Sequence, residues 1–341
     1  MKRDVISLQS VSEAAAGQRL LEYVLWQFAA EVPNEAMRAR QALALLLHGV
    51  YHSPWQEVAW AFSRLTGDGF PVELTFLSHD RSIRYTTEVA GPERREVERF
   101  NCAELLLARL GAKPLPEIER TLFRQVQTNG HLQYGVWIGG RHGPEGDRYK
   151  LYIEVPKDGS ATAEEWVRTR LGELPFLANR VIRLRMIGYE PGSSRTEFYF
   201  RVGELEFWEV ALLLRRAGMA AQEAELLALI EEVYNYSGRP VLFGSNIGFS
   251  FSISPEGKPL AFSLFTYARS VFGGDDNIRR FVLSLGARRG WNLRTYAALS
   301  EPLVGRRDWR TRHGMVAFVV TPEFQPVMHI GLRPPDHLER P

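Results

Sequence analysis

Five alternating segments of the sequence place cations, carboxylates and phenols on one face, in a pattern that could bind a phosphate group. In DRYKLYIEVP, residues 147–156, polar and apolar side chains alternate strictly, which predicts a β-strand with one polar face. The polar-parity residues of the five segments are Ser82, Arg84, Thr86 and Glu88; Arg148, Lys150, Tyr152 and Glu154; Arg195, Glu197, Tyr199 and Arg201; Ala261, Ser263, Phe265 and Tyr267; and Val327, His329, Gly331 and Arg333. Arginine forks, and lysines beside tyrosine hydroxyls, suit a phosphate or a diphosphate. The plain alternative is an open sheet whose polar face is in water.

A carboxylate interrupts another apolar segment. In TGDGFPVELTF, Glu73 lies between apolar neighbours of a predicted strand. Such a glutamate is either exposed at a sheet edge or buried, and a buried one could accept a hydrogen bond from a substrate N–H and take up proton density.

Each polar segment is the second strand of a predicted hairpin, and helical segments precede every hairpin. The predicted hairpins pair residues 69–76 with 82–91, 134–140 with 147–155, 181–189 with 195–202, 248–254 with 259–268, and 314–320 with 326–334. The predicted helices are 10–32, 34–49, 54–64, 93–110, 116–127, 163–172, 204–216, 220–234, 276–289 and 293–299. Equivalent residues of the second strands recur at intervals of 66, 47, 66 and 66 residues, from Arg84 to His329. This period indicates a repeated supersecondary unit.

Ten antiparallel strands separated by helices favour a closed barrel over an open sheet. Closure removes the sheet edges, and the helices need a sheet face on which to bury their apolar stripes. The apolar strand faces would then point outward and the charged faces inward, into a lumen that about ten strands can make wide enough for a ligand. The chain is expected to be one α+β domain over 1–341, with N-terminal helices in 1–66 and the hairpin repeats in 67–335.

Composition narrows the class of protein. The chain has 341 residues, a net charge of +2 and a single cysteine, Cys102. The charge does not argue for nucleic acid or membrane as a partner, and one cysteine excludes an internal disulfide. The N-terminus lacks a signal-peptide core and no apolar run is long enough to span a membrane. We therefore expect a cytoplasmic protein; its oligomeric state is not readable from the sequence.

The strand motifs resemble those of aromatic prenyltransferases of the dimethylallyltryptophan synthase type, the ABBA-fold prenyltransferases, in a bacterial-like form. LTGDGFPVELTF with SIRYTTEVAGPE is similar to the first hairpin of that family, RYKLY to its second, and MIGYEPGSSRTEFYF to its third. The resemblance extends over about residues 50–335. It implies five ααββ repeats, a ten-stranded antiparallel barrel with helices outside, and an active site in the lumen.

The resemblance also implies a reaction: metal-independent, Friedel–Crafts-type transfer of a dimethylallyl or geranyl group from its diphosphate to an indole or a related electron-rich acceptor, such as tryptophan or a peptide. Glu73 would bind the indole N–H. The diphosphate contacts would be Arg84, Lys150, Arg195 and Arg201, and the aromatic shield of the allylic cation would be Tyr152, Tyr199 and Tyr267. Further contacts are expected from Ser263, His329, Arg333 and Glu197. No cofactor or Mg²⁺ is expected; the allylic diphosphate is a co-substrate.

Several positions depart from the family pattern. Glu197 stands where the family has a lysine, and could pair with Arg201 or Lys150 or contact a basic part of the acceptor. Gly331 replaces a tyrosine, which leaves room, and no lysine lies within 130–140 to act as the final base. These changes indicate an acceptor or allylic chain other than tryptophan with a dimethylallyl group.

A magnesium-binding motif and a non-catalytic binding function fit the sequence less well. Asp275 and Asp276 lack the third aspartate of a magnesium-binding motif and are read as an acidic first turn of a helix. A non-catalytic barrel that binds an anionic ligand or single-stranded nucleic acid would also use aromatic side chains beside cations. Glu73 argues against it, because a buried carboxylate repels a polyanion.

Overall fold

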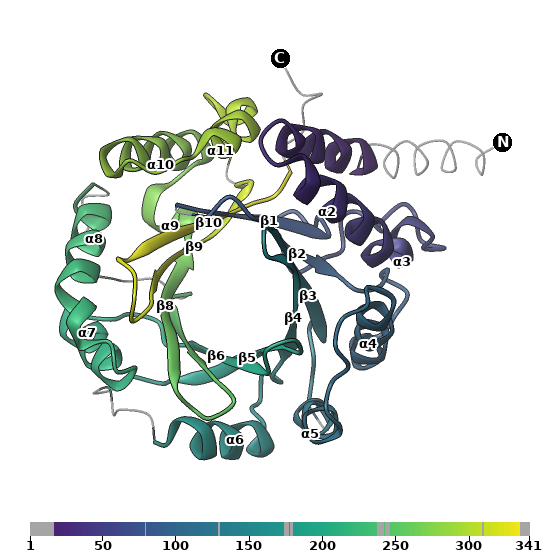
Figure 1. Cartoon of the computed structure of the whole chain (residues 1–341), viewed down its shortest axis with the longest axis horizontal. Helices are drawn as coiled ribbons and strands as arrows, with labels where there is room; N and C mark the ends of the chain where they lie inside the picture. Colours follow the sequence, from purple (N-terminus) through teal and green to yellow (C-terminus); the bar gives the residue numbers. More distant parts are fainter. Residues whose placement is uncertain are drawn as a thin grey trace.

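Ten strands close into one antiparallel barrel, with the helices around the outside (Figure 1). The computed structural model describes residues 17–78, 80–128, 130–173, 177, 180–236, 242, 246–308 and 310–334. The strands are β1 Val72–Leu77, β2 Ile83–Glu88, β3 Val136–Gly143, β4 Gly146–Glu154, β5 Arg183–Glu190, β6 Arg195–Arg201, β7 Gly248–Ile253, β8 Pro259–Tyr267, β9 His313–Val320 and β10 Val327–Leu332. Each strand pairs with its neighbours in sequence, and β1 closes the ring by pairing with β10. The predicted α+β barrel with five hairpins is confirmed.

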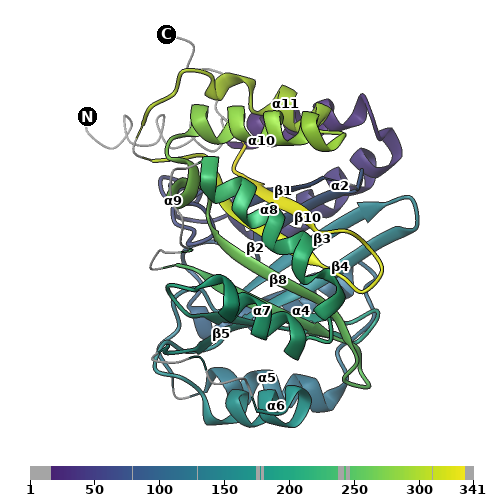
Figure 2. The same ribbon diagram turned by 90° about the vertical axis from the view of Figure 1, so that its left-hand side faces the viewer.

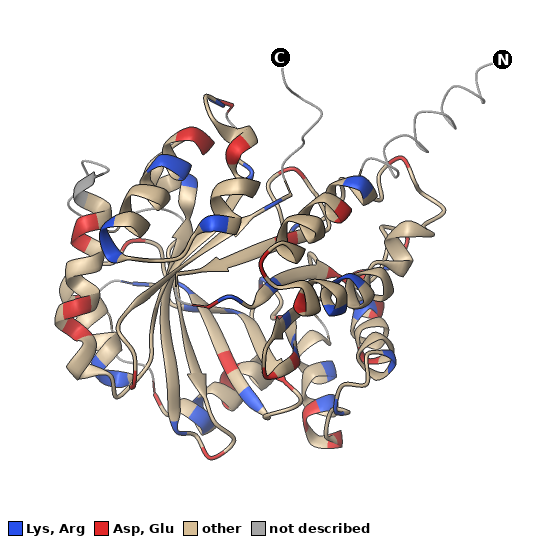
Figure 3. Ribbon diagram, turned by 45° about the horizontal axis from the view of Figure 1, so that its top comes forward, with Lys and Arg blue, Asp and Glu red and all other residues tan. Residues whose placement is uncertain are grey.

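The helices lie between the hairpins in sequence and outside the barrel in space (Figure 2). They are residues 17–29, α2 Pro33–Leu46, α3 His48–Tyr51, α4 Arg99–Arg109, α5 Glu117–Gln127, α6 Ala161–Leu171, α7 Phe207–Arg216, α8 Glu223–Tyr236, α9 Ala268–Phe272, α10 Asp275–Arg289 and α11 Arg294–Leu299, with short 3₁₀ turns at Glu96–Glu98, Ala220–Gln222 and Glu301–Leu303. Residues 10–16 of the first predicted helix lie outside the described residues. Charged residues of both signs are interspersed over the outer helices (Figure 3).

The alternation of each strand separates the core from the lumen. On β4, Leu151 and Ile153 are fully buried and face the helices, whereas Lys150 and Tyr152 have the opposite parity and line the lumen. Aromatic side chains fill the layer between barrel and helices: Trp166 of α6 packs edge-on against Phe198 of β6, with ring centroids 5.2 Å apart. Because the outward faces are covered by apolar helix stripes, the polar faces must point inward.

The predicted helix over 54–64 is wrong. This segment forms turns, in which the Ser53 hydroxyl accepts the N–H of Trp55 and the Gly69 carbonyl accepts the N–H of Ser63. Serine side chains compete with helical hydrogen bonds in this way. Residues 61–69 consequently form a loop that lines the cavity of the barrel instead of packing as a helix on its outside.

No helix within the described part of the chain has the length and apolar character needed to cross a membrane.

Candidate active site

The barrel encloses a cavity of about 1050 Å³, which is large enough for two small substrates. The inward-facing residues of the strands line its length. At one end the lining comes from near the hairpin turns, where Arg84, Arg141 and Arg148 lie. At the other end it comes from the connections to the helices, including the loop 61–69 and Tyr134.

A lysine and a glutamate meet inside the cavity. Lys150 of β4 forms an ion pair with Glu197 of β6 and donates a hydrogen bond to the Tyr199 hydroxyl at 2.9 Å. Ser250 of β7 donates to the other Glu197 oxygen at 2.6 Å. Burial alone would raise the pKa of Glu197, but the charges of Lys150 and Arg195 lower it to about 2. Glu197 is therefore ionised, and it pairs with Lys150, which is one of the three alternatives that the sequence left open.

Aromatic rings surround this lysine. Its ammonium lies 5.0 Å from the centroid of the Tyr152 ring and 5.2 Å from that of Tyr199. Phe265 of β8 continues the wall, with its ring centroid 6.0 Å from that of Tyr199. Ring faces that already contact an ammonium can also stabilise a carbocation, by about 2 kcal/mol when desolvated.

Two arginines converge on one aspartate near the hairpin end. Arg84 of β2 and Arg141 of β3 both donate to Oδ2 of Asp80, at 2.6 and 2.9 Å, and both contact the Ser82 hydroxyl. Burial would raise the pKa of Asp80, but its bonds to Arg84 and Ser82 hold it well below the usual range. Burial and the neighbouring Arg141 lower the pKa of Arg84. One carboxylate thus offsets two guanidinium groups, and a net positive charge remains for an anion.

Arg141 was missed by the sequence analysis. The signal was present, because Trp137, Gly139 and Arg141 share one parity on the first strand of the second hairpin, and only second strands were searched for cations. Its Cα is paired with that of Arg84, which brings the two arginines side by side.

Glu73 occupies a notch made by two glycines. A Cβ on Gly314 would lie 1.7 Å from the Glu73 Oε1 atom, and one on Gly331 would lie 2.6 Å from it. Burial raises the pKa of Glu73 to about 8, against a hydrogen bond from the Met315 backbone that lowers it. The carboxyl is thus in the lumen and partly desolvated, rather than at an exposed sheet edge, and Gly331 supplies the room that the sequence indicated.

The other predicted site residues on β6, β8 and β10 line the cavity, but not all of them at the same end. Ser263, Tyr267 and His329 line the cavity. Arg195 also lines it, and its Nε donates to the Ser252 hydroxyl. Arg201 lines the opposite end, six residues further along β6. Six residues of a strand span about 20 Å, so Arg195 and Arg201 cannot hold the same diphosphate. Arg201 therefore lies too far from Arg195 to belong to the same diphosphate site.

Arg333 is placed outside the cavity, against the expectation that it faces the lumen. It follows the last residue of β10, its Nε lies 3.0 Å from an Asp68 oxygen, and its guanidinium lies 4.6 Å from the Phe70 ring centroid. The strand alternation ends at Leu332, so parity no longer determines the direction of the next side chain.

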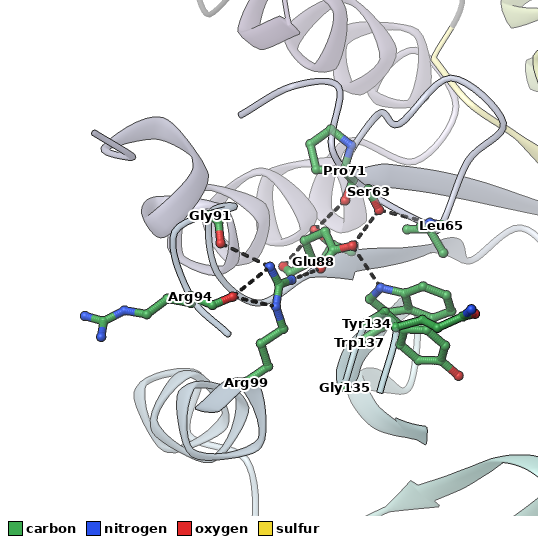
Figure 4. A network of polar contacts seen from close by, with 12 residues as sticks. Ser63, Leu65, Pro71, Glu88, Gly91, Arg94, Arg99, Tyr134, Gly135 and Trp137 are labelled. Atoms are coloured by element: carbon green, nitrogen blue, oxygen red, sulfur yellow. Dashed lines mark hydrogen bonds and ion pairs between the residues drawn. The ribbon is translucent and has the colours of Figure 1, made fainter. Parts of the chain in front are cut away.

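Glu88 also departs from its expected direction. It is buried and forms an ion pair with Arg99 of α4, while Ser63 and the indole Nε1 of Trp137 donate to its other oxygen at 2.5 and 2.9 Å (Figure 4). Glu154 is likewise buried and accepts the backbone N–H groups of residues 133–135. These two carboxylates fix the cavity wall and do not line it.

The described residues contain no cluster of side chains that could bind a metal ion. No group of three or more histidine, cysteine, aspartate or glutamate side chains among them is arranged to hold an ion. Asp275 lies in the first turn of α10, as predicted, and accepts hydrogen bonds from the backbone of Arg312 and from the His313 ring.

Solved structures of several prenyltransferases share this architecture. The apo form of the prenyltransferase PriB superposes with a TM-score of 0.75 at 14% identity, over 96% of this chain and 97% of that one. The 5-dimethylallyl tryptophan synthase from Streptomyces coelicolor, in complex with DMASPP and Trp, gives 0.73 at 17% identity over 96% of each chain. The 6-dimethylallyltryptophan synthase from Micromonospora olivasterospora gives 0.69 at 18% identity, over 94% and 97%. The chain has the fold of these prenyltransferases.

The likeness to these proteins is detected in the structure and not by sequence comparison. No protein-family profile and no curated protein matches the chain. The barrel fold that the hairpin motifs implied is confirmed, because solved structures at 13–20% identity share it.

Proposed function

We propose that the protein is an aromatic prenyltransferase, which transfers an allylic group from its diphosphate to an electron-rich aromatic ring. The observation that carries the proposal is the shared cavity. A cationic region of Arg84, Arg141, Lys150 and Arg195 lies in the same lumen as an aromatic wall and the separately held Glu73. A diphosphate, an allylic cation and an acceptor N–H each need one of these three features.

The first step is ionisation of the allylic diphosphate. The carbon–oxygen bond breaks, the electron pair stays on the diphosphate oxygen, and the allylic fragment becomes a cation. Preorganised cations around the leaving oxygens stabilise the developing negative charge and supply several kcal/mol. Arg84 with Arg141, Lys150 and Arg195 serve this purpose, while the rings of Tyr152 and Tyr199 face the carbon cation.

The second step is attack by the aromatic ring. A ring carbon forms the new carbon–carbon bond, and the ring stays cationic until the proton on that carbon passes to a base, for which the diphosphate released in the first step is available. Glu73 accepts the hydrogen bond of the acceptor N–H, which becomes more acidic as the ring gains positive charge. Glu73 therefore stabilises the intermediate more than the bound acceptor, as catalysis requires.

The acceptor class is an indole or a related N–H aromatic, tryptophan and small peptides included, and the donor is a dimethylallyl or geranyl diphosphate. The structures of the M. olivasterospora and S. coelicolor enzymes hold DMASPP and Trp together, which supports such a pairing for this barrel. We further propose that no divalent metal takes part, because protein cations can perform the role that Mg²⁺ has in other prenyl transfers.

Binding of a polyanion such as single-stranded nucleic acid is the weaker candidate. The ionised Glu197 lines the lumen and would repel a chain of phosphates.

Incubation of the protein with each diphosphate and a panel of indoles, in the presence of a chelator, tests the proposal. We expect a product heavier by one prenyl unit and release of diphosphate. The absence of both binding and turnover for every allylic diphosphate would reject the proposed function.

A further inference from the structure

One buried carboxylate fixes a tryptophan at the cavity wall. The Nε1 of Trp137 donates to Oε1 of Glu88 at 2.9 Å, and the Ser63 hydroxyl donates to the same oxygen at 2.5 Å. Oε2 of Glu88 forms the ion pair with Arg99. Figure 4 shows these contacts converging from three separate parts of the chain: the loop 61–69, the start of α4 and β3.

Moving the Glu88 carboxylate would cost a large amount of free energy. Glu88 and Arg99 are 1% and 4% exposed, and Arg99 also donates to the Gly91 carbonyl at 3.1 Å. Breaking a buried ion pair leaves an uncompensated charge, which is strongly destabilising. Trp137 is therefore held by an acceptor that is itself fixed, and its indole cannot rotate out of the cavity wall without losing this hydrogen bond.

A second ring restricts the other side of the indole. Tyr134 stacks on Trp137, with ring centroids 3.7 Å apart and an angle of 9° between the planes. Both residues line the cavity. The backbone of residues 133–135 is in turn bound by Glu154. The Trp137–Tyr134 pair is thus a rigid part of the lumen wall.

The pair lies beyond the proposed diphosphate site. On β3, Arg141 and Trp137 are four residues apart, or roughly 13 Å along the strand. Trp137 is the Cα partner of Tyr152 and Gly139 that of Lys150, so the lining that β3 and β4 contribute changes from cationic to aromatic in the direction of Trp137. A chain whose diphosphate contacts Arg84, Arg141 and Lys150 and whose first carbons contact Tyr152 extends toward the Trp137–Tyr134 pair.

We propose that Trp137, positioned by Glu88, limits the length of the allylic chain that the lumen accepts. The inference rests on the proposed function. A dimethylallyl group fits before the indole, whereas the second isoprene unit of a geranyl group requires the volume that the indole fills. Glu88 is a positioning residue in this arrangement and Trp137 is the side chain that contacts the donor.

The test measures the binding of two unreactive donors, dimethylallyl and geranyl thiolodiphosphate, by calorimetry. It compares the wild type with Trp137→Ala and Trp137→Leu. Trp208→Ala is the matched control, because Trp208 is 52% exposed on α7 and its Nε1 donates to Glu206 at 2.7 Å, also in a tryptophan–glutamate pair. Circular dichroism and thermal melting establish that each variant is folded, and the leucine variant serves if the alanine variant is not.

We expect the wild type to prefer the dimethylallyl analogue. Trp137→Ala should shift the ratio of the two affinities toward geranyl by at least about tenfold, the gain from burying roughly two more methylene groups. Trp208→Ala should leave the ratio unchanged. The inference is overturned if both analogues bind and the ratio in folded Trp137 variants stays within about twofold of the wild type. If neither analogue binds the wild type, the proposed function fails and the inference with it.

Discussion

Lys150 on β4 forms its ion pair with Glu197 on β6, although β5 lies between the two strands. The side chain crosses β5 at Gly188, where a Cβ would lie 2.3 Å from the Lys150 Cε atom. The cation proposed to hold the diphosphate is thus neutralised by a carboxylate, and Lys150 can reach that carboxylate because residue 188 is a glycine.

Glu197→Gln should increase the affinity for an allylic diphosphate. The substitution removes an ionised carboxylate from beside Lys150. An incoming diphosphate then neither competes with the Glu197 carboxylate for the Lys150 ammonium nor is repelled by that carboxylate. We expect binding of dimethylallyl thiolodiphosphate to tighten by about tenfold in calorimetry at low salt. Glu104→Gln, which removes a carboxylate paired with Arg120 outside the barrel, should have no effect. Weaker binding by Glu197→Gln would mean that Glu197 helps to position Lys150.

Glu73→Gln should lower turnover far more than donor affinity. In its ionised form Glu73 supplies negative charge to the acceptor N–H as the ring becomes cationic, whereas an amide cannot ionise, and such contributions are worth about 10²–10⁴ in rate. The diphosphate contacts are on other strands, so the dissociation constant of the donor analogue should change by less than about threefold. Steady-state rates and calorimetry measure the two quantities separately. Wild-type turnover in the variant would remove Glu73 from the mechanism.

Gly314→Ala should displace the Glu73 carboxylate. The added methyl group would overlap the Oε1 atom, so Glu73 must turn away from its notch. We expect the KM for the aromatic acceptor to rise by about tenfold or more, with the donor affinity little changed. Gly192→Ala is the control, because a Cβ on Gly192 meets no atom within 4 Å. An unchanged KM in a folded Gly314→Ala variant would show that the position of the carboxylate is not critical.

Stability should fall as pH rises from about 5 to 9. The pKa of Glu73 is raised from 4.5 in the unfolded chain to about 8 in the fold. Between these values the folded state binds the extra proton, so the contribution of this group is full below the unfolded pKa and is lost as pH rises through the folded one. The loss is on the order of 5 kcal/mol. Chemical denaturation at several pH values should show this slope in the wild type and a smaller one in Glu73→Gln; parallel curves would contradict the raised pKa.

Much of the fold could be predicted from the alternation of polar and apolar side chains along each strand. Side chains on a strand point to opposite faces with a period of two, a consequence of backbone geometry that needs no knowledge of distant residues. The five hairpins and the inward direction of Arg84, Lys150 and Tyr152 could therefore be predicted, whereas alternation alone left both an exposed edge and a buried position open for Glu73. The helix proposed for 54–64 failed because Ser53 and Ser63 use backbone N–H groups in turns, a local competition that the apolar spacing does not reveal.

Parity along each strand establishes which strand face is polar, and hence that cations, phenols and one isolated carboxylate share a lumen. The folded barrel establishes which of them meet: Lys150 with Glu197 across Gly188, Arg84 and Arg141 on Asp80, Glu88 with Trp137, and Arg333 outside the cavity on Asp68. Parity depends on a single strand, whereas a contact between strands depends on their register in the closed barrel and on the reach of each side chain past its neighbours.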